Sequence, residues 1–223
     1  MHRFGLLLRR EFHLQWCSTG KMGLFASLFF SLLLIFISGY AYVNAQSTPD
    51  ISHISVIFCF IFLISTQFAV SFLGSRSRKF ESELKLLPCA GSNIFVSRHI
   101  AIFSGIALIY LFAIPAFLIL FNIDISLVSI LQLVFITISV AIAQISIGLI
   151  TQFNYLGFNK QISNFAILFA LPLLFPVFTT NLIAVMSVFG NNNAGLSEIL
   201  MIISLDILYF AAGLLIFELT AKL

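Results

Sequence analysis

Six long apolar stretches alternate with short polar connections along this chain. The stretches cover residues 22–43, 51–74, 94–121, 125–151, 162–188 and 196–218. Each contains at least about the 20 residues that an α-helix needs to cross the hydrocarbon core of a bilayer. The pattern therefore predicts an all-α membrane protein, with six transmembrane helices in a single integral-membrane domain over residues 1–223.

The positively charged residues all fall on one side of this six-span arrangement. They precede span 1, lie in the connections between spans 2 and 3 and between spans 4 and 5, or follow span 6: Arg3, Arg9, Arg10, Lys21, Arg76, Arg78, Lys79, Lys85, Arg98, Lys160 and Lys222. The other three connections contain no Lys or Arg. By the positive-inside rule we expect a multi-pass protein with both termini and the second and fourth connections in the cytoplasm, or on the matrix side in an organelle.

Composition narrows the classes of function. The chain is 61% hydrophobic and 9% charged, whereas a soluble domain carries about 25% charged residues. The spans use nearly the whole sequence, so no room remains for a soluble catalytic domain. The basic residues serve topology, and the net charge of +3 therefore predicts no nucleic-acid partner. The three cysteines are widely spaced and predict no disulfide framework.

A signal peptide is the alternative interpretation of span 1, because basic residues precede an apolar run that ends in the sequence Ala-Tyr-Val-Asn-Ala at residues 41–45. The apolar core of a signal peptide has about 7 to 15 residues, and this run is longer. We therefore expect span 1 to be retained.

The first 21 residues predict an amphipathic helix that lies in the membrane interface. Apolar positions gather near one helical face and polar positions surround the rest: Phe4, Leu7, Leu8 and Phe12 against Arg3, Arg9, Arg10, Glu11 and His13. Such a helix buries its apolar face at the boundary while its arginines reach lipid headgroups. The alternative is a basic segment that only fixes topology.

The connection between spans 2 and 3, residues 75–98, is the longest and most charged. Phe80, Leu84 and Leu87 recur at helical spacing, and Pro88 then ends the pattern. This spacing is typical of a short cytoplasmic helix whose apolar ridge docks on a soluble partner. The predicted docking residues are Phe80, Glu81, Glu83, Leu84, Leu87 and Pro88. An ordinary solvated loop is the alternative.

Prolines interrupt two of the spans. Pro172 and Pro176 lie in span 5, and Pro115 lies late in span 3. Each proline removes a backbone donor, so we expect span 5 to be bent, unwound or re-entrant. The functional interpretation is a flexing element beside a gate, and the alternative is plain helix packing.

The order of these elements resembles the membrane subunit of ATP-binding-cassette exporters, and more narrowly the haem exporter protein B family of cytochrome c maturation. The matching motifs are Leu-Arg-Arg-Glu at residues 8–11, Leu-Lys-Leu-Leu-Pro at residues 84–88, Pro115, and Leu-Pro-Leu-x-x-Pro at residues 171–176. The family usually has a Glu six residues before the proline that corresponds to Pro88, and this chain has Ser82 at that position.

The resemblance implies a non-catalytic, permease-like subunit of a hetero-oligomer. A separate cytoplasmic ATPase would dock on the helix between spans 2 and 3, since the chain has no Gly-x-x-x-x-Gly-Lys-Ser/Thr loop of its own. Haem would be a substrate of the complex rather than a bound cofactor, and haem-handling membrane proteins and a haem chaperone would be partners. The alternative is the permease of another cassette exporter, for lipid, polysaccharide or drug.

The membrane interior offers few polar groups. Asp206 lies inside span 6, where a charged Asp costs about 3 kcal/mol, so we expect it to face the bundle or to be protonated. Gln67 and Gln144 are candidate hydrogen-bonding partners from other spans. His53 and His99 lie near span ends, where each is either a candidate haem ligand or an ordinary interfacial histidine. No catalytic residue or metal ligand is predicted, and so few polar groups disfavour a membrane enzyme.

The charge pattern generates a topology prediction. Reporter fusions after Gln46, Asn122 and Asn192 are expected to report the outer side, and fusions after Ser77 and Asn159 the inner side, because no Lys or Arg lies in the first set of connections. Alkaline phosphatase and fluorescent-protein fusions would measure the two sides. An inner-side signal after Asn122 would contradict the six-span arrangement.

Overall fold

The computed structural model describes residues 2–16, 18–44, 50–78, 91–152, 163–190 and 194–220. Nearly all of them are helical, and no strand occurs among them. In chain order the helices are α1 (His2–Trp16), α2 (Ser18–Asn44), α3 (Ile51–Arg78), α5 (Gly91–Leu120), α6 (Leu127–Gln152), α7 (Ser163–Phe189) and α8 (Leu196–Thr220).

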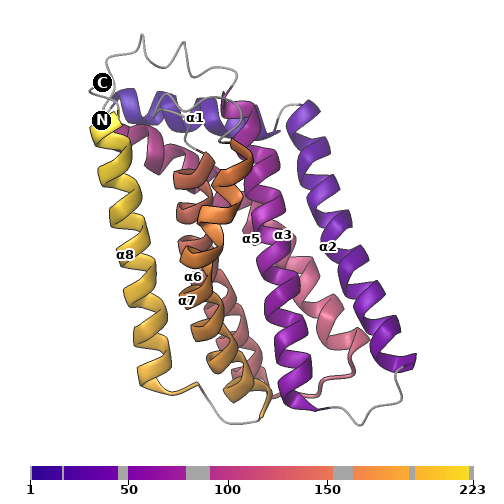
Figure 1. Cartoon of the computed structure of the whole chain (residues 1–223). Coiled ribbons are helices and arrows are strands. Elements are labelled where there is room, and N and C mark those ends of the chain that lie inside the picture. The colour runs from indigo at the N-terminus through magenta and orange to yellow at the C-terminus, as the bar shows by residue number, and fades with distance from the viewer. Residues whose placement is uncertain are drawn as a thin grey trace.

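Six of these helices are long and apolar enough to span a membrane: the segments are Lys21–Asn44, Ile51–Ser71, Gly91–Leu120, Leu127–Thr151, Pro172–Phe189 and Leu196–Leu219. They run side by side as an up-and-down bundle, and α1 lies across one end of it (Figure 1). The prediction of an all-α membrane protein with six spans is confirmed. The predicted helix between spans 2 and 3 lies outside the described residues.

The bundle has two chemically different ends. One end, which we call the α1 end, carries α1, the last turn of α8 and the helix ends that flank residues 79–90 and 153–162 (Figure 1). The opposite end carries the connections from α2 to α3, from α5 to α6 and from α7 to α8. No Lys or Arg occurs in those three connections, whose acidic residues are Asp50 and Asp124.

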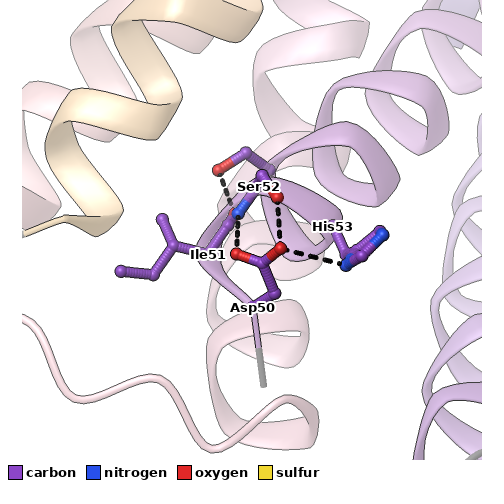
Figure 2. A network of polar contacts seen from close by, with 5 residues as sticks. Asp50, Ile51, Ser52 and His53 are labelled. Atoms are coloured by element: carbon purple, nitrogen blue, oxygen red, sulfur yellow. Dashed lines mark hydrogen bonds and ion pairs between the residues drawn. The ribbon is translucent and has the colours of Figure 1, made fainter. Parts of the chain in front are cut away.

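Helix starts at the end opposite to α1 are closed by side chains. Asp50 caps α3: it accepts hydrogen bonds from the Ser52 backbone N–H at 3.1 Å and the Ser52 hydroxyl at 2.6 Å (Figure 2). The hydrogen bond from the Ser52 hydroxyl is the main reason why the pKa of Asp50 lies below its ordinary value. His53 Nδ1 lies 3.3 Å from the same carboxylate. Glu198 closes α8 by accepting from the Gly195 N–H at 3.0 Å.

Aromatic rings fill the core near the same end. Phe58 of α3 meets Phe117 of α5 and Phe189 of α7 edge to face, with ring centroids 5.0 and 5.5 Å apart. Phe117 and Phe58 are fully buried. Edge-to-face pairs contribute about 0.5–1.5 kcal/mol beyond the burial of their area. They join three helices into one packed unit.

Glycines set the closest approach between helices elsewhere. At Gly213 of α8, an added Cβ would lie 2.3 Å from Phe95 Cζ of α5. At Gly148 of α6, it would lie 2.6 Å from Val70 Cγ1 of α3. Small residues at such positions let membrane helices pack closely, and close packing is the main attraction between helices in lipid.

Helix α7 continues through Pro172 and Pro176 without a break, and α5 continues through Pro115. An unwound or re-entrant segment is therefore excluded there, and of the three predicted forms only a bend is compatible with a continuous helix. The hydroxyl of Thr180 donates to the Pro176 carbonyl at 2.8 Å, and the hydroxyl of Tyr209 on α8 donates to the Leu173 carbonyl at 2.9 Å. Side-chain donors thus supplement the backbone of the proline segment, as is common in membrane helices.

The contact at Gly213 generates a stability prediction. Gly213→Ala is expected to lower the free energy of unfolding by about 1–3 kcal/mol, because the buried ring of Phe95 has no room to move away. Denaturant titration in mixed micelles measures it. The control is Gly5→Ala, where an added Cβ meets nothing within 4 Å and helix propensity favours Ala. Equal effects of the two substitutions would contradict the packing argument.

Candidate functional site

The predicted docking residues Phe80, Glu81, Glu83, Leu84, Leu87 and Pro88 lie outside the described part of the chain. The structure describes the helices on either side, α3 up to Arg78 and α5 from Gly91. Both flanking ends lie at the α1 end of the bundle (Figure 1). The first turns of α5 follow the predicted docking segment and have described side-chain contacts, so we treat these contacts as the candidate site.

The first turn of α5 is held by the last turn of α8. The backbone N–H of Ser92 donates to Oε2 of Glu218 at 3.2 Å. The first N–H groups of a helix have no partner within it, and a carboxylate there is favoured by both hydrogen bonding and the helix dipole. Glu218 thus caps a helix that lies far away in sequence.

Two turns into α5, a buried ion pair joins it to α1. Nε of Arg98 lies 3.9 Å from Oε1 of Glu11, and both residues are only 4% exposed. Leu7, one helical turn before Glu11, is buried on the same face of α1. The crosswise helix is therefore fixed to the bundle by an apolar contact and a charged contact.

This pair corrects two sequence-based expectations. Glu11 was expected among the outward polar positions of the first helix, yet it shares the buried face with Leu7. Arg98 was expected in a cytoplasmic connection, yet α5 begins at Gly91 and carries Arg98 inside the bundle. The reason is mutual compensation, since each charge is tolerated in the interior because the other lies opposite. One feature of the sequence could have revealed the burial of Glu11. It is the only acidic residue in the basic segment 1–21, and it follows Leu7 by four residues, so both side chains fall on one helical face.

His99 is buried as well. It is 5% exposed, and its ring packs against Phe95 and Phe210 with centroids 5.7 and 5.1 Å away. Neither ring nitrogen has a hydrogen-bond partner in the described part of the chain. His53, by contrast, is exposed beside Asp50 at the opposite end (Figure 2). The two histidines therefore do not form one site.

Gln67 and Gln144 come together in the membrane interior. Nε2 of Gln67 on α3 donates to the backbone carbonyl of Gln144 on α6 at 3.2 Å. That hydrogen bond lies beside Gly148. Because Gly148 has no side chain, Gln67 and Val70 can pack closely against α6 there. The two amides were candidate partners of Asp206, and that pairing stays a prediction. Asp206 is 8% exposed and faces the bundle, as the cost of burial predicts.

Two of the three span prolines border hollows on the bundle. Pro176 lines a groove of about 410 Å³ between α7 and α8, together with Thr179, Thr180 and Ser204. Pro115 lines a smaller, apolar hollow of about 240 Å³ between α5 and α6. Whether any of these prolines serves a gate stays a prediction.

Among the described residues, no three His, Cys, Asp or Glu side chains gather into a group able to hold a metal ion. Cys59 is a free, buried thiol. Comparison with known proteins adds no assignment: no family model, no curated protein and no solved structure matches this chain.

The buried ion pair generates a double-mutant prediction. Glu11→Leu and Arg98→Met are each expected to lower the free energy of unfolding by about 3 kcal/mol, because each leaves a buried charge without its partner. The double variant is expected to lose much less than the sum, since no charge remains to be compensated. Unfolding in mixed micelles measures all three variants.

The control for these variants is Arg9→Met, which removes an exposed charge from the same helix. It is expected to change stability by no more than about 0.5 kcal/mol. Strictly additive losses at positions 11 and 98 would show that the two side chains do not interact.

Proposed function

We propose that this chain is the permease-like membrane subunit of an ATP-driven complex that delivers haem for the assembly of c-type cytochromes. It sits in the inner membrane with both termini in the cytoplasm and works within a hetero-oligomer. A separate cytoplasmic ATPase hydrolyses ATP, because the sequence contains no phosphate-binding loop. Haem-handling membrane proteins and a haem chaperone are the further partners.

The observation that carries the proposal is the construction around the start of α5. The docking segment of residues 80–88 leads directly into this helix. Three other contacts converge on its first turns: Glu218 on the Ser92 N–H, Glu11 on Arg98, and Phe95 in the space above Gly213. A force applied to the docking segment would therefore reach α1, α5 and α8 together. Rigid connection of this kind suits a subunit that receives work from a soluble motor.

The charge pattern supports the same orientation. No Lys or Arg occurs in the three connections at the opposite end of the bundle, and the amphipathic α1 lies across the α1 end. The motifs at residues 8–11, 84–88 and 171–176 supply the link to haem delivery in particular.

A second candidate is the permease of an exporter for a lipid-like amphiphile. The groove between α7 and α8 favours it, because it combines apolar side chains with the hydroxyl-bearing Thr179, Thr180 and Ser204. Such a lining suits a molecule with an apolar body and a polar handle. Purification in mild detergent with mass spectrometry of partners separates the candidates: an ATPase with haem-handling proteins supports the first, and an ATPase alone supports the second.

The docking helix generates a direct test of the ATPase partnership. Leu84→Asp is expected to abolish co-purification of the ATPase, because the substitution puts a charge into an apolar groove. Buried anchors of this kind contribute about 2 kcal/mol or more each, and losing several of these contacts together would release the partner.

The matched control is Lys85→Ala, the adjacent residue on the charged face. Exposed charges contribute little to docking, so this variant is expected to keep the ATPase bound. Both variants leave every span unchanged and should reach the membrane in normal amounts. Normal ATPase binding by Leu84→Asp would remove the docking role of the segment.

A further inference from the structure

Asp206 is a carboxyl group in the interior of the bundle that the proposed function does not use. It lies near the middle of the span Leu196–Leu219 and is 8% exposed. Its oxygen Oδ1 has no hydrogen-bond partner in the described part of the chain. The carboxyl lies against the backbone of Ala143 in α6, the most buried of the spans.

The helices packed against α8 supply no charge to balance an ionised Asp206. The sequences of α6 and α7 contain no Asp, Glu, His, Lys, Arg, Cys or Tyr. In α5 the titratable residues are Arg98, His99 and Tyr110. Arg98 pairs with Glu11 near the α1 end, and the Tyr110 hydroxyl is engaged with Thr66 and with the Phe62 carbonyl.

His99 is the remaining titratable group of α5, and the register of the α5–α8 pair fixes where it lies. Phe95 packs against Gly213 and His99 packs against Phe210. Asp206 precedes Phe210 by four residues, which is one helical turn farther from the α1 end. On α5 that level corresponds to the apolar Phe103, so His99 lies about one turn from the carboxyl, beyond the ring of Phe210.

We infer that Asp206 is a proton-binding site inside the membrane. An ionised carboxylate in this position would lie in hydrocarbon surroundings with neither a cationic partner nor a donor for Oδ1, and that arrangement is strongly disfavoured. Binding a proton removes the charge and lets α8 pack against α6. This inference does not depend on the partnership with an ATPase.

Reaction with an apolar carbodiimide tests the site in the unmodified full-length protein. Dicyclohexylcarbodiimide dissolves in the membrane and reacts with protonated carboxyl groups. The carboxyl proton moves to a carbodiimide nitrogen, the carboxylate oxygen adds to the central carbon, and an acyl shift gives a stable N-acylurea. Peptide mapping by mass spectrometry then locates the adduct. We expect it at Asp206, with a rate that falls about tenfold per pH unit once the proton is lost.

Two controls define the result. Asp124, exposed in the connection between α5 and α6, is expected to react with a water-soluble carbodiimide in the presence of an amine, whereas Asp206 is not. Asp206→Asn is expected to lose the apolar adduct; if that variant fails to fold, the measurements on the unmodified protein stand alone.

Four outcomes would overturn the proton site. These are no adduct at Asp206 at any pH, an adduct rate independent of pH, reaction with the water-soluble reagent to the same extent as Asp124, and protection by sodium or potassium ions. The last would assign the carboxyl to a metal cation instead of a proton.

Discussion

The hydrocarbon core of a bilayer offers no hydrogen-bond partner to a peptide group, and the whole architecture depends on that constraint. Each span must satisfy its own N–H and C=O groups, which only a helix achieves within one segment. The first N–H groups of each helix have no carbonyl partner within the helix, and side-chain oxygens accept their hydrogen bonds instead. These side chains are Asp50, Ser126 and Glu198 at one end of the bundle and Glu218 at the other. The polar residues near the span ends thus have a structural task before any functional one.

Helix association then rests on shape. Lipid tails are as apolar as leucine, so burying apolar side chains between helices gains little, and close packing must supply the attraction. Gly213 and Gly148 permit that packing where α8 meets α5 and α6 meets α3. The aromatic rings of α3, α5 and α7 fill the core near the other end. This combination leaves the interior tight and mostly nonpolar, so that each buried polar group stands out.

Those polar groups divide into two kinds. Glu11 with Arg98, and Glu218 with the Ser92 N–H, form contacts that join α1 and α8 to the start of α5. They couple the start of α5, which follows the predicted docking segment, to α1 and α8. Asp206 and His99 have atoms without partners in the described chain. Unsatisfied buried polar groups are uncommon, and the proton site inferred above accounts for Asp206.

The sequence by itself determined the six spans, the crosswise first helix and the separation of charge between the two ends. These follow from local properties: apolar length, helical periodicity and the position of Lys and Arg can each be recognised within a short window. The burial of Asp206 could be predicted in the same way, because a carboxyl group within an apolar span is less costly inside the bundle than against lipid.

The partners of the polar residues were decided only by the tertiary structure. Helices α2 and α3 lie between Glu11 and Arg98 in the sequence, and α6 and α7 lie between Ser92 and Glu218. No local pattern could pair them, nor could one show that the Gln67 side chain donates to the backbone carbonyl of Gln144. The physical reason is that pairing depends on the rotation and tilt of each helix. These are set by where small and large side chains meet across several helices, and that information is distributed over the whole chain.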